Sequence, residues 1–209
     1  MATQYAFGQI VNSGLVLSLN VADKNSYPGS GTTWTDMSGN GVSSTLSGVT
    51  YNSSFGGMFT WDSGTDRIDN PLMPFLNTAN STVCFWLRTT DTRFVVFTRF
   101  GTPYLGAVYV EGTGNGNWYH AGAGIPVTYR NAIQASGPLL DGSWNYYTFT
   151  NVNFSADIIW STAVTNILYY PGGWEFTSGN LASFSIYNRN LSVAEIAQNY
   201  NAQKSRFGL

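Results

Sequence analysis

The sequence predicts an all-β protein, built as an antiparallel two-sheet jelly-roll β-sandwich with one short C-terminal helix. Several segments alternate apolar and polar residues with a period of two, which is typical of strands with one buried and one wet face. Clusters of Gly, Ser, Asn and Asp recur at the short intervals that separate sandwich strands. Aromatic residues make up 16% of the 209 residues, and aromatic side chains favour strands.

Four segments carry strong strand signals. Residues 15–20 alternate leucines with other residues and predict a first strand. Residues 81–88 and 93–100 are rich in β-branched and aromatic side chains, so we expect two core strands joined around residues 90–91. Residues 145–150 follow a turn and alternate, with Tyr147 and Phe149 facing away from Tyr146 and Thr148.

A fifth strand is expected near the C-terminus, over residues 181–187. Its alternation predicts one dry and one wet face. The side chains expected on the dry face are Ala182, Phe184 and Ile186, and those on the wet face are Ser183 and Ser185.

A short amphipathic helix follows this strand. Ser192 is a good N-cap and Glu195 comes three residues later, so the pair predicts a capping box. Leu191 and Ile196 have the spacing of a hydrophobic staple, and Gly208 can end the helix. The helix is expected to have an apolar stripe made of Val193, Ile196, Ala197 and Tyr200. Lys204 and Arg206 are expected at its C-terminus, where cations interact favourably with the helix dipole.

Both ends of the chain resemble one known family. Residues 184–196 (FSIYNRNLSVAEI), with 199–201 (NYN) and 206–208 (RFG), resemble the closing motif of concanavalin A-like lectin/glucanase domains. The nearer resemblance is to the laminin-G-like jelly-roll branch. Residues 14–20 (GLVLSLN) and 26–41 resemble the opening of the same domains.

More narrowly, the sequence is similar to versions of this domain in virion proteins of tailed phages, notably marine phages. The resemblance implies one jelly-roll domain over residues 14–209, preceded by an N-terminal arm of residues 1–13. It also implies binding loops in the middle of the chain, roughly residues 98–140, where the match is weakest.

Composition excludes several classes of partner. Charged residues are 10% of the chain, the net charge is −2 and no basic run is present, so we expect no nucleic acid. No segment approaches the roughly 18 apolar residues that a membrane span needs, so we expect no membrane insertion.

Cys84, the single cysteine, is interpreted as a buried small hydrophobe. The start of the chain lacks the pattern of a signal peptide, which predicts folding in a host cytoplasm.

The carboxylates do not form the pattern of a glycosidase. Glycoside hydrolysis needs two carboxyl groups roughly 5–9.5 Å apart. The three glutamates are Glu111, Glu175 and Glu195; none has an acidic residue two positions away, and the last is expected in the helix cap. His120, the only histidine, is interpreted as a polar edge residue, because a triad or a zinc site needs further partners. The protein is therefore predicted not to be an enzyme.

Sugar binding calls for an exposed aromatic ring with amides nearby. The best candidates lie in the middle of the chain, and ordinary packing or a subunit contact is the alternative role for the Trp among them. They are Trp118, Tyr119, Tyr104 and Tyr109, near Asn115 and Asn117. The remaining tryptophans with expected core or core-edge positions are Trp34, Trp61, Trp86, Trp144 and Trp160.

A calcium site is a further hypothesis. Asp62, Asp66 and Asp69 could supply the hard oxygens that calcium prefers. The same residue types also stabilise turns through side-chain to backbone hydrogen bonds, and this alternative is favoured. Residues 36–40, with Asp36, Ser38 and Asn40, allow the same two interpretations.

The predicted function is that of a non-enzymatic virion structural protein of a tailed phage. It would be a capsid decoration protein or a head or tail fibre component, located in the virion and bound to other virion proteins as a homo-oligomer. Its lectin-like fold would either attach to the particle lattice or hold host-surface glycans. The alternatives are a stand-alone carbohydrate-binding module and, less favoured, a glycoside hydrolase.

Overall fold

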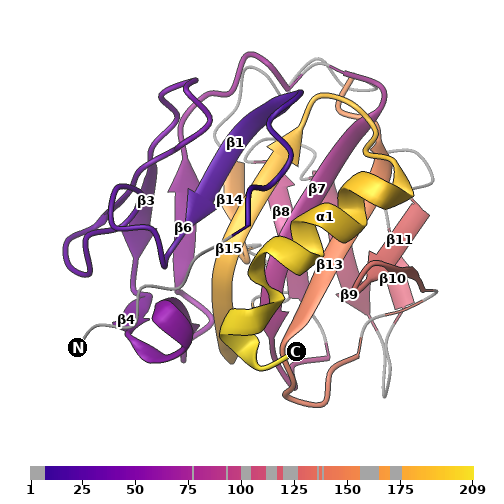
Figure 1. Ribbon diagram of the computed structural model, residues 1–209. Coiled ribbons are helices and arrows are strands. Elements are labelled where there is room, and N and C mark those ends of the chain that lie inside the picture. Colours follow the sequence, from indigo (N-terminus) through magenta and orange to yellow (C-terminus); the bar gives the residue numbers. More distant parts are fainter. Residues whose placement is uncertain are drawn as a thin grey trace.

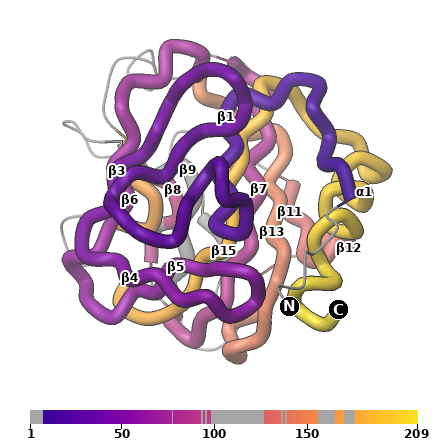
Figure 2. Tube along the Cα trace, turned by 60° about the vertical axis from the view of Figure 1, so that its left-hand side comes forward, coloured from indigo at the N-terminus to yellow at the C-terminus, as the bar shows by residue number. Residues whose placement is uncertain are grey.

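The computed structural model shows two antiparallel sheets packed face to face, with a helix on the outside of one of them. The structure describes residues 8–76, 78–92, 94–99, 105–111, 117–119, 127–135, 137, 139–155, 165–169 and 176–209. Within these residues every strand pairing is antiparallel. Figure 2 shows the layers in the order sheet, sheet, helix.

The sheet beside the helix is called sheet A and the other sheet B. Sheet A has the order β12 (Ile133–Gln134), β11 (Val127–Arg130), β13 (Asn145–Val152), β7 (Ser81–Arg88), β15 (Gly179–Tyr187), β5 (Met58–Trp61) and β4 (Thr50–Asn52), with β1 (Leu15–Asn20) also paired to β15. Sheet B has the order β10 (Asn117–Tyr119), β9 (Leu105–Glu111), β8 (Phe94–Arg99), β14 (Thr165–Ile167), β6 (Arg67–Asn70), β3 (Ser44–Ser47) and β2 (Thr33–Trp34). The predicted all-β sandwich with a C-terminal helix is therefore confirmed.

Aromatic side chains fill the space between the sheets. Phe85 on β7 stacks on Phe149 and Phe184 of the neighbouring strands, with ring centroids 5.8 and 6.0 Å apart. Phe97 from sheet B stacks on Phe184 from the opposite side at 5.7 Å. As predicted, Tyr147 faces this core with Phe149. Burying large aromatic surfaces is a main source of stability in such a core.

The predicted strands at 81–88 and 93–100 exist as β7 and β8, but they are not neighbours. β7 pairs with β13 and β15 in sheet A, whereas β8 pairs with β9 and β14 in sheet B. The turn around residues 90–91 therefore crosses from one sheet to the other. Both strands are apolar because both line the core, and their composition does not say on which side of it each one lies.

Sheet A is apolar on its outer face as well as on its inner face. Cys84, Trp86 and Tyr146 lie on the outer face and form a second cluster with residues of the C-terminal segment. Helix α1 (Val193–Gln203) and the 3-10 helix η3 (Lys204–Phe207) cover this face, and Figure 1 shows α1 crossing in front of β7 and β13. The ring of Phe207 stacks on Trp86 with centroids 4.3 Å apart.

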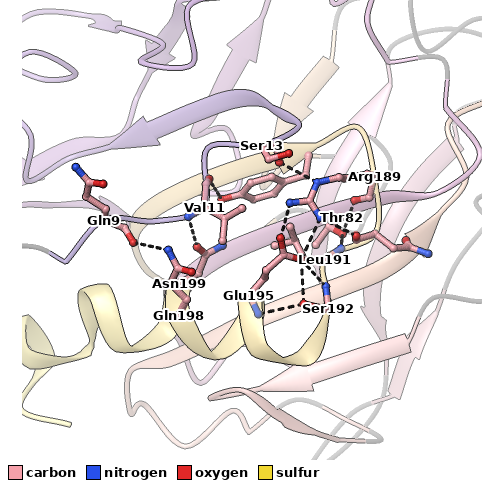
Figure 3. Close-up of polar contacts among 12 residues, drawn as sticks. Gln9, Val11, Ser13, Thr82, Arg189, Leu191, Ser192, Glu195, Gln198 and Asn199 are labelled. Carbon is pink, nitrogen blue, oxygen red and sulfur yellow. Dashed lines mark hydrogen bonds and ion pairs between the residues drawn. The ribbon is translucent and has the colours of Figure 1, made fainter.

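The start of α1 has the predicted capping box. The Ser192 hydroxyl accepts the Glu195 N–H at 3.3 Å, and the Glu195 carboxylate accepts the Ser192 N–H at 2.8 Å. Arg189 adds an ion pair to the same carboxylate at 2.6 Å, as Figure 3 shows. Gly208 ends η3 in the left-handed region, with φ of 77°.

The buried stripe of α1 differs from the predicted one. Ile196 is buried, but Val193 is 57% exposed and the other buried positions are Asn199, Ala202 and Gln203. Arg206 lies in the last turn of η3, but its side chain is buried and donates to the carbonyl oxygens of Phe55 and Gly57. The helix therefore docks through amides as well as through apolar side chains.

The second half of the predicted N-terminal arm packs on the chain's own helix. The Asn199 side chain accepts the Val11 N–H at 2.8 Å, and the Tyr187 hydroxyl donates to the Val11 carbonyl at 3.0 Å. Gln198 donates to the Gln9 carbonyl at 3.0 Å (Figure 3). Residues 9–13 are therefore part of the folded domain; residues 1–7 lie outside the described residues.

The predicted alternation of β15 is broken at one point. The register between β15 and β7 shifts between Leu181 and Ser183, as at a β-bulge. Leu181, rather than Ala182, therefore lies in the inter-sheet core with Phe184, and Ala182 lies on the helix side. Among the described residues, no helix has the length and apolar character required to span a bilayer.

Candidate functional site

Most of the predicted sugar-binding residues lie on two paired strands of sheet B. Strand β10 pairs with β9 so that Trp118 lies opposite Val110 and Tyr119 opposite Tyr109. Asn117 begins β10, so four of the six predicted residues share one two-stranded edge of sheet B. Tyr104 and Asn115 lie outside the described residues, as do His120, Trp160 and Glu175.

The three aspartates of the calcium hypothesis do not form a common site. The buried Asp66 carboxylate accepts the backbone N–H groups of Asp62 and Ser63 at 3.0 and 3.2 Å, so it stabilises the turn. Asp69 instead pairs with Arg67 at 3.0 Å on strand β6. In the described part of the chain, no group of three metal-ligating side chains is found. The turn interpretation fits this geometry.

Residues 36–40 also have a structural role. One Asp36 oxygen accepts the N–H groups of Ser18 and Ser38 at 2.8 and 2.9 Å. The hydroxyl of Ser38 and the amide of Asn40 both donate to the Val16 carbonyl, at 3.0 and 2.9 Å. This loop thus bonds the outward-facing edge of β1, and the described residues include no strand beside that edge.

Cys84 is a buried, unreactive thiol, as predicted. It has no disulfide partner, and the Thr148 hydroxyl points to its sulfur at 3.6 Å. Burial raises the pKa of the Cys84 thiol to about 11. Four of the five tryptophans with predicted core positions, Trp34, Trp61, Trp86 and Trp144, are buried.

A groove of about 610 Å³ lies on the outer face of sheet A. Its floor is formed by β1 and β15 with Ser18, Ser183 and Ser185, and one wall is the N-terminal segment 8–12. The loop after β1 and residue Gln203 of the helix complete it. The lining residues are Gly8, Gln9, Ile10, Asn12, Ser18, Leu19, Asn20, Ala22, Asp23, Lys24, Met37, Ser183, Ser185 and Gln203.

Several groove side chains are held in place by hydrogen bonds. The Ser183 hydroxyl donates to the Gln203 side-chain oxygen at 3.2 Å. The Asn20 side-chain oxygen accepts the Ala22 N–H at 3.1 Å and Arg206 at 3.0 Å. Most of the polar side chains in the lining therefore carry hydroxyl or amide groups, and Asp23 is the only carboxylate among the described lining residues.

Of the three glutamates, Glu195 has a structural role. Arg189 donates to both oxygens of Glu195. This interaction, with the Ser192 N–H, lowers the pKa of Glu195 to about 2. Glu111 is the last residue of β9. Neither residue lines the groove.

Sequence reasoning did not find the groove. Its walls come from residues 8–12, 18–24 and 183–185, which are brought together only by the pairing of β1 with β15 and by the docking of the helix. The local signal was the pair Ser183 and Ser185 on the wet face of a strand. Such a pattern predicts that this face of the strand meets solvent, but it does not predict that the face forms part of a groove.

No protein-family model matches the chain, and no curated protein matches it. Solved structures do. Domain 4 of the extracellular GH43 arabinanase of Geobacillus stearothermophilus, in complex with arabinotriose, matches with a TM-score of 0.58 at 14% identity, covering 90% of this chain and 98% of that domain.

Two further matches are partial. The sialidase of Trypanosoma rangeli, in complex with the inhibitor DANA, has a TM-score of 0.58 at 12% identity, and this chain spans 36% of its length. The binding domain of botulinum neurotoxin serotype G has a TM-score of 0.56 at 15% identity, with 91% of this chain and 51% of that one covered. At such identities the matches establish a shared β-sandwich fold.

Proposed function

We propose that the protein is a non-enzymatic carbohydrate-recognition module and that the groove on sheet A is its saccharide site. The observation that carries this proposal is the lining of the groove. Hydroxyl and amide groups from four segments converge on a volume of about 610 Å³, which is within the roughly 300–1,000 Å³ of ligand sites. A saccharide presents hydroxyl groups that both donate and accept, and such a lining can satisfy them.

The absence of catalysis is part of the proposal. Glycoside hydrolysis requires two carboxyl groups on either side of the scissile bond. The groove lining contributes one carboxylate, Asp23, and one ammonium, Lys24. Assays for release of reducing sugar from β-glucans and arabinans are expected to give no product. Hydrolysis that is lost when Asp23 is changed to Asn would overturn this part.

Glycan binding tests the groove directly. The wild-type protein is expected to bind neutral oligosaccharides on a glycan array, and calorimetry with the best ligand then measures the affinity. Asp23→Ala removes a polar group from the lining and Ser185→Phe fills the groove; each should weaken binding by about tenfold or more. Asp62→Ala is the matched control, since Asp62 is an exposed carboxylate outside the groove.

Two results would contradict the groove assignment. One is an affinity that stays the same in both groove variants while their thermal unfolding is unchanged. The other is the absence of any neutral glycan bound by the wild-type protein across the array.

The proposed setting is the virion of a tailed phage, as a capsid decoration protein or a head or tail fibre component that assembles as a homo-oligomer with other virion proteins. The resemblance of both chain ends to virion versions of this domain supports it. A fold that needs no disulfide, with Cys84 buried and unpaired, is compatible with synthesis in a cytoplasm. Mass spectrometry of purified particles should find the chain at a fixed copy number. A monomer absent from particles would favour the rival, a stand-alone carbohydrate-binding module.

A further inference from the structure

Arg88 stands at the end of β7 on the outer face of sheet A, outside the groove. Its Nε and Nη2 atoms both donate to the Asn180 side-chain oxygen, at 3.0 and 2.7 Å. The amide of Asn180 donates in turn to the Thr60 hydroxyl at 2.9 Å. The guanidinium is therefore held in one position by neutral groups of two neighbouring strands.

Two aromatic rings flank this guanidinium. Its carbon lies 5.6 Å from the centroid of Phe55 and 5.5 Å from that of Trp144. Both distances are within the range of cation–π attraction. Phe207 packs behind them, with its ring 4.6 Å from Trp144. These contacts fix the cation without neutralising its charge.

Arg88 differs in this respect from two other arginines. Arg67 pairs with Asp69 at 3.0 Å and Arg189 pairs with Glu195 at 2.6 Å. In the part of the chain that the structure describes, no carboxylate lies within ion-pair distance of Arg88. A guanidinium has five N–H donors in a planar fork, and at Arg88 Asn180 uses only two of them.

The backbone that presents Phe55 is strained. Phe55 has φ 54° and ψ 30°, the left-handed region, which costs a non-glycine residue of order 1–3 kcal/mol and recurs at ligand clamps. Arg206 holds this conformation by donating to the Phe55 carbonyl at 2.8 Å. In this backbone conformation the Phe55 ring contacts both Arg88 and Trp144.

A further donor belongs to the same cluster. The indole Nε1–H of Trp144 is buried and has no hydrogen-bond acceptor among the described residues, as is also true of the indole N–H groups of Trp34 and Trp86. Buried polar groups without a partner are uncommon and call for an explanation such as a bound ligand or water. Trp144 thus adds an unused donor to those of Arg88.

We propose that this Arg88 cluster, made of Arg88, Asn180, Trp144 and Phe55, binds the acidic group of an anionic polysaccharide. A carboxylate or sulfate oxygen pair matches the planar fork of a guanidinium. The ring of Phe55 offers an apolar surface to the sugar that carries the acid. The chain has a net charge of −2, so attraction of a polyanion must come from a local cation and not from the overall charge.

Calorimetry with three polymers tests the proposal at low ionic strength. Polygalacturonate carries carboxylates, dextran sulfate carries sulfates, and dextran is neutral. The wild-type protein is expected to bind at least one acidic polymer with an affinity that falls as salt is added, whereas any binding of dextran in the groove should not depend on salt. The two acidic polymers distinguish a carboxylate site from a sulfate site.

A matched pair of arginine variants locates the site. Arg88→Met keeps the packing stem but removes the fork, and should weaken binding by about tenfold or more. Arg67→Met is the control, because Arg67 also lies over a ring, that of Tyr169 at 5.4 Å, but its charge is already paired. The acidic polymer should bind Arg67→Met as it binds the wild type.

Further measurements keep the test decisive. If Arg88→Met does not fold, Arg88→Lys retains the charge without the fork and should still bind severalfold more weakly. The indole N–H resonance of Trp144 should shift when galacturonate is added. Asp23→Ala should leave acidic binding unchanged, so this site and the groove can fail separately. Equal binding by wild type and either Arg88 variant, or no acidic polymer bound by the wild type, would overturn the proposal.

Discussion

The two sheets share one core but differ on their outer faces. In β7 every residue from Ser81 to Leu87 is buried, and β13 is buried over nearly its whole length. In β6 of sheet B, buried and half-buried residues alternate, as do buried and more exposed residues in β3. A strand buried on both faces needs a cover, and in sheet A that cover is α1 with η3 (Figure 2).

The difference teaches that a continuous apolar strand can signal a third layer. Trp86, Tyr146 and Ala182 would be exposed if the chain ended at β15. The capping box therefore also matters for the tertiary structure. It starts the helix at the position from which the helix can cover these three side chains. Where sheet B faces outward in the described strands, Thr33 and Thr45 are exposed and require no cover.

The largest expected effect separates the two outer faces. Trp86→Ala removes a ring stacked between sheet A and Phe207, and we expect a loss of about 3–5 kcal/mol in the free energy of unfolding. Thr45→Ala on the outer face of sheet B should change it by no more than about 0.5 kcal/mol. Urea unfolding of both variants measures the contrast. Equal losses would mean that the helix layer contributes little.

The next effect concerns the amides beneath the helix. Asn199→Ala leaves the buried Val11 N–H without its acceptor, which should cost about 1–3 kcal/mol. The exposed Asn201, in the same helix, is the control position for the same change. Hydrogen exchange at the Val11 amide should become faster in Asn199→Ala only. Unchanged exchange there would contradict a docked N-terminal segment.

A smaller effect should depend on pH. The folded-state pKa of Glu195 is about 2 against 4.5 for the free side chain, so its contribution is complete above pH 4.5 and is lost as the pH falls toward 2. Glu195→Gln should therefore cost about 1 kcal/mol at neutral pH. The difference from wild type should shrink across that acidic window. A difference that stays constant from pH 6 to pH 2 would rule out the ionised cap.

The smallest effect is expected on the polar face of sheet B. The Arg67 and Asp69 side chains are 35% and 30% exposed, and an exposed pair of this kind contributes about 0.2–1 kcal/mol. Arg67→Met should lower stability by that amount at low salt and by less at high salt. Thermal unfolding at two ionic strengths checks this. If Arg67→Met lowered the free energy of unfolding as much as Trp86→Ala does, the proposed difference between the two outer faces would be wrong.

Local patterns predicted the sandwich, the first and last strands and the helix start. Ser192 and Glu195 act within one turn, so a stretch of four residues carries all the information they need. The buried Asn199 was not predictable, because its partner Val11 lies 188 residues away. The sheet to which β8 belongs was hidden for a similar reason, since an apolar strand is the same on either side of a core.

The two proposed sites show the same limit. The groove is assembled from segments at both ends of the chain. The Arg88 cluster needs Phe55 and Trp144, which the sequence places far from β7 and from each other. The aromatics that the sequence did suggest, around Trp118, share the short β9–β10 edge, and their role in sugar binding stays a prediction.

The loop of residues 36–40 has a consequence for how copies of this protein can associate. The outward N–H and C=O of Ser18 bond to Asp36 and to the Met37 N–H, and the outward Val16 carbonyl is taken by Ser38 and Asn40. These three main-chain groups are already bonded within the molecule, so an incoming strand cannot pair with them to lengthen the sheet. Filament growth by strand addition is disfavoured at this edge of β1.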